Sequence, residues 1–134
     1  MKPFVHTWRV RVRYAETDQM HVAWHGSYLL YFEEARTEAL RASGWTYRSL
    51  EETGVLLPVV EAHIDFARPA RYDDLLAVQT TVFPPAGARM RFEYRVRDES
   101  GADVVSGHTV LAFLNAATRR PCRPPAEMRK IFEG

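Results

Sequence analysis

Only one segment of this sequence has the spacing of a long helix, and that limits the chain to a few architectures. From Tyr28 to Ser43 apolar residues recur at helical intervals, and Gly44 follows, a residue type that often ends helices in the left-handed conformation. Towards its end the apolar positions become small, as Ala35 and Ala39 illustrate. Small side chains let a helix axis lie close to a sheet, so the segment predicts one helix wrapped by strands.

Much of the remaining chain alternates apolar and polar residues with the period of two that is typical of half-buried strands. The predicted strands cover residues 8–14, 59–67, 75–83, 89–97 and 104–115, with turns at 72–74 and 98–101. Short helical segments are expected at 47–53 and 124–132. One strand, one long helix and four antiparallel strands define an α+β fold, in one domain that covers residues 1–134.

Composition and charge exclude several classes of protein. Hydrophobic residues make up 46% of the chain and charged residues 26%, which is ordinary for a globular protein and argues against disorder. The formal net charge of +1 gives no reason to expect nucleic acid or an anionic membrane as a partner. The one cysteine, Cys122, cannot form an internal disulfide, and no apolar run suits a signal peptide or a membrane span. A cytoplasmic location is expected.

A single sheet of this size has one face for the helix and another that water or a partner must cover. Trp8, Phe83 and Phe113 suggest that apolar surface is left for a partner. A homodimer or a larger assembly is therefore expected.

Residues 14–28, between the first strand and the long helix, are the most informative about chemistry. Ser27 is expected to cap the helix through its hydroxyl. The free N–H groups and positive dipole of a helix start could stabilise an anionic transition state, and Asp18 is close by in sequence. Gly26 would let a substrate come close to the backbone.

Taken alone, this spacing leaves a structural role for Asp18 open, and that role is the commoner one. Asp18 could cap its loop or pair with an arginine. A metal site made of Asp18, His21 and His25 is disfavoured, because His-x3-His binds metal well only within a helix and here it precedes one. No serine lies in a Gly-x-Ser-x-Gly setting, and there is no glycine loop for phosphate. We predict no metal and no cofactor.

The stretch RYAETDQMHVAWHGSY, residues 13–28, followed by YFEEAR at residues 31–36, resembles the 4-hydroxybenzoyl-CoA thioesterase-like hotdog family. Its Asp-x6-His-x2-Tyr pattern is fairly specific to that family, and the most similar-looking branch is the YbgC-type acyl-CoA thioesterases. The resemblance continues through Phe66, Arg68 and residues 72–74, and more loosely through the later strands.

This resemblance implies a hotdog fold, an antiparallel sheet of about five strands wrapped around one long helix, and hydrolysis of acyl-CoA to free acid and CoA. Asp18 would be the catalytic carboxylate, acting as nucleophile or as general base. The backbone N–H of His25, or of its neighbour, would polarise the thioester carbonyl, and the His25 side chain is a second catalytic candidate. Family members dimerise edge to edge, often pair into tetramers, and build active sites between subunits.

By the same resemblance, Tyr28 would shape the site, and Arg89 and Arg91 would lie near the CoA nucleotide. Which of Tyr14, Trp24, Tyr28, Tyr31 and the partner chain's residues 56–60 approach the acyl group stays open. For each arginine, a solvated strand face is an equally good interpretation. Acyl carrier protein remains a possible carrier of the acyl group. The rival functions are a hotdog hydratase or dehydratase, whose histidine–carboxylate pair has no match here, and a non-catalytic acyl-thioester-binding protein.

Overall fold

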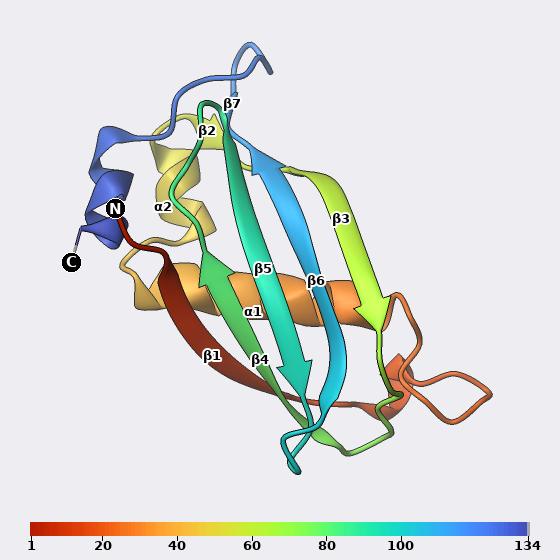
Figure 1. Cartoon of the computed structure of the whole chain (residues 1–134). Helices are drawn as coiled ribbons and strands as arrows, with labels where there is room; N and C mark the ends of the chain where they lie inside the picture. The colour runs from red at the N-terminus through yellow and green to blue at the C-terminus, as the bar shows by residue number, and fades with distance from the viewer. Residues whose placement is uncertain (134) are drawn as a thin grey trace.

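A computed structural model describes residues 1–133, and its centre is a five-stranded antiparallel sheet curved around one long helix (Figure 1). The strand order is β1-β4-β5-β6-β3, and a separate two-stranded sheet pairs β2 with β7. The elements run in the order β1 (Phe4–Arg11), η1 (Tyr14–Glu16), α1 (Ser27–Ala42), α2 (Tyr47–Glu52), β2 (Val55–Leu56), β3 (Val59–Phe66), β4 (Leu75–Val82), β5 (Arg89–Arg97), β6 (Asp103–Ala112), β7 (Leu114–Asn115) and η2 (Ala126–Phe132). The predicted α+β hotdog fold is confirmed.

Helix α1 crosses the concave face of the sheet, and its buried stripe explains why it can lie so close (Figure 1). Ala35 and Ala39 are fully buried, as their small size predicted. Phe32 stacks on Tyr94 of β5 with ring centroids 4.1 Å apart. Gly107 of β6 also leaves room for the Phe32 ring on this face of the sheet. The core thus lies between one helix and one sheet face.

Several predicted boundaries were wrong, and the reasons are local. The first strand was expected at residues 8–14 but runs from Phe4 to Arg11. It ends there because the backbone N–H of Arg13 donates to the side chain of Glu16 and the chain turns into η1. The last strand, expected to be continuous to Asn115, divides into β6 and β7, because Leu114–Asn115 pairs with Val55–Leu56 instead.

The expectation that Phe113 leaves apolar surface for a partner was also wrong. Phe113 is fully buried in the core, while Trp8 and Phe83 are half-buried. The exposed apolar side chains lie elsewhere, and those of Val59, Val60 and Phe66 belong to β3. β3 is an edge strand, paired only with β6 among the residues that the structure describes.

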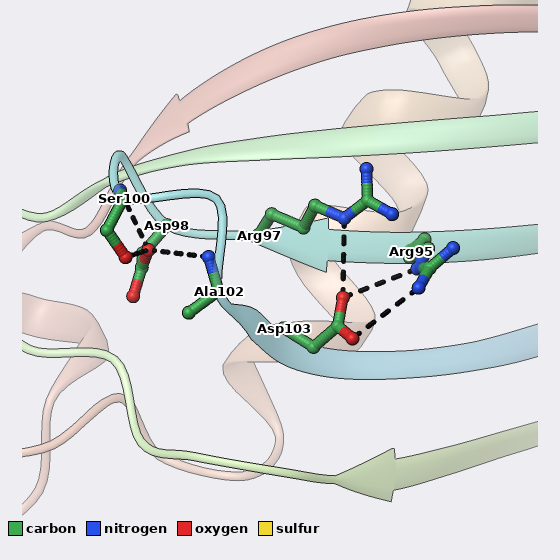
Figure 2. A network of polar contacts seen from close by, with 6 residues as sticks. All are labelled: Arg95, Arg97, Asp98, Ser100, Ala102 and Asp103. Atoms are coloured by element: carbon green, nitrogen blue, oxygen red, sulfur yellow. Dashed lines mark hydrogen bonds and ion pairs between the residues drawn. The ribbon is translucent and has the colours of Figure 1, made fainter.

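The hairpin between β5 and β6 is held by two carboxylates, as Figure 2 shows. Asp98 accepts hydrogen bonds from the backbone N–H groups of Ser100 and Ala102 and from the Ser100 hydroxyl, which confirms the turn predicted at residues 98–101. Asp103 accepts from Arg95 and Arg97 across the strand ends. These hydrogen bonds, from Ser100 to Asp98 and from the two arginines to Asp103, hold the pKa of each carboxyl below its usual value.

Candidate active site

Asp18 lies at the base of a tight turn between η1 and α1. Thr17 and Ala23 form an antiparallel bridge, and the Asp18 N–H donates to the Val22 carbonyl at 2.9 Å. The His21 N–H donates back to the Asp18 carbonyl, also at 2.9 Å, and His21 adopts a positive φ of 65° to close the turn. The position of Asp18 is therefore fixed by main-chain bonds on both sides.

The carboxylate of Asp18 is only partly used by the loop. Its Oδ1 accepts the Met20 N–H at 2.9 Å, which is the loop-capping role that the spacing left open. Its Oδ2 accepts no hydrogen bond and the side chain joins no ion pair among residues 1–133. Asp18 is half-buried, so one oxygen is oriented by the backbone and the other is available.

The chain enters α1 immediately after this loop. The Ser27 N–H donates to the Trp24 carbonyl at 2.8 Å, whereas the N–H groups of His25 and Gly26 donate to no acceptor within residues 1–133. Free N–H groups at a helix start lie in the positive field of the helix dipole and can stabilise an anion. The capping role expected for Ser27 was wrong: its hydroxyl donates to the Glu16 carbonyl at 2.9 Å, and Gly26 holds the N-cap position without a side-chain bond.

Asp18, His25 and Tyr28 line one groove of about 330 Å³. The other lining residues are Met20, Val22, Ala23, Phe66, Ala67, Arg68 and Pro69. The structure thus brings together a carboxylate with a free oxygen and the residue whose N–H is free. Phe66 and Tyr28 add an aromatic wall, with ring centroids 5.8 Å apart.

Tyr28 is placed by the backbone of the segment that follows β3. Its side chain is 2% exposed, and its hydroxyl accepts the Ala70 N–H at 3.3 Å. The Ala70 carbonyl in turn accepts the Ala23 N–H at 2.7 Å, so residue 70 joins the helix to the Asp18 loop. Burial raises the pKa of the Tyr28 phenol, which keeps the hydroxyl neutral and favours a wall role over an acid–base role.

The remaining predicted site residues do not line this groove. Tyr14 is 79% exposed and meets Tyr72 edge to face, and Trp24 is 50% exposed and lies against His25. The Trp24 indole covers the face of Gly26 where a Cβ would stand, so within this chain the indole uses the space that glycine leaves.

Arg89 and Arg91 lie within β5, and Arg91 donates to Glu93 at 2.8 Å. In the register of β5 with β6, Arg89 is opposite Ala112, near the Val59 end of β3. Phe66, at the groove, is at the other end of β3, roughly 23 Å away along the strand at about 3.3 Å per residue. One chain therefore does not bring these arginines to its own groove.

Three residues near the loop were not singled out as site residues from the sequence: Phe66, Arg68 and Glu16. Phe66 and Arg68 reach the groove through the pairing of β3 with β6, a long-range contact that alternation alone does not show. Their only sequence signal was their place in the family resemblance. Glu16 is 8% exposed, although it precedes Asp18 in a stretch with no periodicity.

With this geometry established, the chain can be compared with known proteins. The family model for the thioesterase-like superfamily matches residues 12–132. The acyl-CoA thioesterase YbgC of Haemophilus influenzae is 38% identical over 125 residues, which cover 92% of this chain and 90% of that protein. The chain therefore belongs to the thioesterase-like superfamily, and the resemblance to the YbgC-type branch is confirmed.

Solved structures agree with the fold. The DHNA-CoA thioesterase of Staphylococcus aureus superposes with a TM-score of 0.85 at 28% identity, over 96% of this chain and 84% of that one. A 4-hydroxybenzoyl-CoA thioesterase in complex with 4-hydroxybenzoyl-CoA superposes with a TM-score of 0.86 over 96% of this chain and 99% of that one. Its identity is 18%, so this second likeness bears on the fold alone.

Proposed function

We propose that this protein hydrolyses acyl-CoA thioesters to free acid and CoA, with Asp18 as the catalytic carboxylate and the His25 N–H as oxyanion donor. The observation that carries the proposal is the shared groove: Asp18 and His25 both line it, and within residues 1–133 one Asp18 oxygen and the His25 N–H have no hydrogen-bond partner. The similarity to acyl-CoA thioesterases supports the reaction class.

The chemistry requires little more than these two groups. A thiolate is a good leaving group, so hydrolysis needs a nucleophile or a general base and a site for the developing oxyanion. Asp18 either attacks the carbonyl carbon, expelling CoA thiolate and leaving an acyl anhydride that water cleaves, or removes a proton from an attacking water. In both routes the carbonyl oxygen becomes negative near the start of α1. The His25 imidazole, exposed at the groove, can orient water or substrate.

The proposal includes a homodimer formed along the free edge of β3. An exposed eight-residue edge strand offers unpaired N–H and C=O groups, and Val60 on it is 49% exposed. Antiparallel pairing of two copies would bring the Val59 end of one β3 beside the Phe66 end of the other. Arg89 and Arg91 of the partner subunit would then approach this groove, where the CoA phosphates need cations.

Assembly and location complete the proposal. Two dimers could pair into a tetramer, and acyl carrier protein is a second possible carrier of the acyl group. Cys122 is free, which suits the reducing cytoplasm. Among residues 1–133, no helix has the length and apolar character needed to cross a bilayer. Sedimentation equilibrium tests the assembly, and a monomer at micromolar concentration would contradict the shared site.

Thiol release from a panel of acyl-CoAs tests the reaction. Asp18→Asn should lower kcat at least about a hundredfold, because the amide can neither attack nor accept a proton. Asp73→Asn is the matched control: Asp73 is exposed, lies outside the groove, and has a positive φ of 71° that asparagine tolerates. If the wild type binds acyl-CoA but releases no thiol, the protein is a non-catalytic binder and the proposal fails.

A single turnover in ¹⁸O-labelled water tests the nucleophilic route for Asp18. Label in the Asp18 carboxylate would exclude pure general-base catalysis, since water oxygen reaches the side chain only through an anhydride intermediate. Label confined to the released acid is the result expected of general-base catalysis and of an anhydride that water attacks at its acyl carbon.

A further inference from the structure

We propose that Glu16 is the residue that positions Asp18, by fastening both ends of the loop that carries Asp18 and His25. Glu16 does not line the groove, so it acts on the reaction only through this loop. The inference rests on the proposed function for its kinetic consequence, although the fastening itself can be measured without turnover.

The side chain of Glu16, the last residue of η1, accepts four hydrogen bonds. Its Oε1 accepts the Arg13 N–H at 2.8 Å and the Tyr31 hydroxyl at 3.1 Å. Its Oε2 accepts the Nε and Nη2 of Arg13 at 3.2 and 3.1 Å. The carboxylate therefore connects Arg13, in the turn that follows β1, to the second turn of α1.

The main chain of Glu16 makes a second connection. Its carbonyl accepts the Trp24 N–H at 2.8 Å and the Ser27 hydroxyl at 2.9 Å. Residues 16 and 27 are thus held together, and everything between them forms a closed loop. Asp18 and His25 both lie inside that loop, one near each end.

Glu16 is ionised in this setting although it is buried. Burial by itself opposes ionisation, but the hydrogen bonds from the backbone and guanidinium of Arg13 and from Tyr31 outweigh it and hold the pKa of Glu16 below its usual value. The Tyr31 hydroxyl, itself buried, has its pKa raised by burial and by the neighbouring carboxylate, so it remains a donor. Charge-assisted bonds of this kind are shorter and stronger than neutral ones.

The consequence for catalysis is geometric. A nucleophile and an oxyanion donor must be held at once, and a displacement of about 1 Å can cost about a hundredfold in rate. The groove walls, by contrast, come largely from Phe66, Pro69 and Tyr28, and within residues 1–133 the Glu16 side chain makes no hydrogen bond to any of them. Loss of the Glu16 bonds should therefore lower kcat and leave KM nearly unchanged.

Glu16→Gln is the decisive variant, because glutamine keeps the shape but places an N–H₂ group where Oε2 receives the Arg13 guanidinium. We expect kcat to fall roughly ten- to a hundredfold with KM within about twofold. By NMR, amide exchange at Asp18 and Met20 should accelerate, while that in β5 and β6 should not change. Tyr31→Phe, which removes only the bond to the helix, should give a smaller effect in the same direction. Glu99→Gln in the exposed hairpin turn is the matched control.

If amide exchange at Asp18 and Met20 is unchanged in both Glu16→Gln and Tyr31→Phe, the inference is overturned. It is also overturned if kcat falls only in proportion to the fraction of protein that has unfolded. If Glu16→Gln does not fold, Tyr31→Phe decides by the same two measurements. Absence of thiol release by the wild type would refute the proposed function instead, and the exchange rates would still show whether Glu16 holds the loop.

Discussion

Replacing Gly107 with alanine should destabilise the sheet where β3 joins β6. Gly107 lies in extended backbone within β6, so alanine meets no conformational penalty there, and only the added methyl group matters. A Cβ at this position would lie 3.0 and 3.2 Å from two ring carbons of Phe32 and closer still to the backbone oxygen of His63. Carbon atoms prefer separations of about 3.5–4.0 Å, so the ring must retreat by roughly 0.5 Å.

The His63 contact sets the magnitude, because a backbone oxygen cannot rotate away. β3 itself must shift against β6, and added methyl groups in tightly packed positions cost about 1–3 kcal/mol. We expect the upper end of that range, about 3 kcal/mol, since a strand rather than a side chain must move. At about 4 °C per kcal/mol for a chain of this length, Tm should fall by roughly 12 °C.

Thermal unfolding followed by circular dichroism measures this shift. Ser106→Ala is the control, because Ser106 is the exposed neighbour in the same strand and its replacement removes a hydroxyl without adding volume. A Tm for Gly107→Ala within roughly 2 °C of the wild type would refute the reasoning, because it would mean that β3 yields to the methyl group at almost no cost.

Two further predictions concern charge. The folded-state pKa of Glu16 is depressed, so its contribution to stability is present above the unfolded pKa of about 4.3 and is lost as pH falls through the lower folded pKa. The Tm of the wild type should therefore fall more steeply than that of Glu16→Gln between about pH 4.5 and pH 3. Parallel curves of Tm against pH would contradict the role of the ionised carboxylate. Replacing both Arg89 and Arg91 with alanine should raise KM for acyl-CoA about tenfold, because the CoA phosphates lose two cations. Hydrolysis of the same acyl group on a short thiol without phosphates, such as N-acetylcysteamine, should not change. Equal losses on both substrates would place the two arginines outside the nucleotide site.

The fold could be predicted largely from periodicity, because a single sheet around a single helix gives each element one buried face. Helix α1 begins and ends within a residue of the predicted segment, and the strands β3, β4 and β5 lie where alternation placed them. The two-residue strands β2 and β7 could not be predicted, since they are too short to show a period and exist only because they pair with each other.

The candidate site was less accessible to sequence reasoning. Asp18 and His25 were identified through the family resemblance, and they line one groove, but their catalytic roles stay predictions. Glu16 gave no periodic signal, because its carboxylate is held by hydrogen bonds from Arg13, in the turn before η1, and from Tyr31 of α1. The end of β1 was misplaced for the same reason: the N–H of Arg13, which would have continued the sheet, donates to Glu16 instead.

A single chain does not place Arg89 and Arg91 of β5 at its own groove. A groove of about 330 Å³ is at the lower end of the volumes that hold small ligands, so it suits an acyl group but not a whole CoA ester. The nucleotide must then extend beyond the groove. Phe66 is 59% exposed on the edge strand and lies on the groove wall, so that edge is where a second copy would add surface. In the proposed dimer, antiparallel pairing of two β3 strands would bring Arg89 of the partner subunit towards the same edge. A dimer would therefore complete the phosphate-binding part of the site that each subunit lacks.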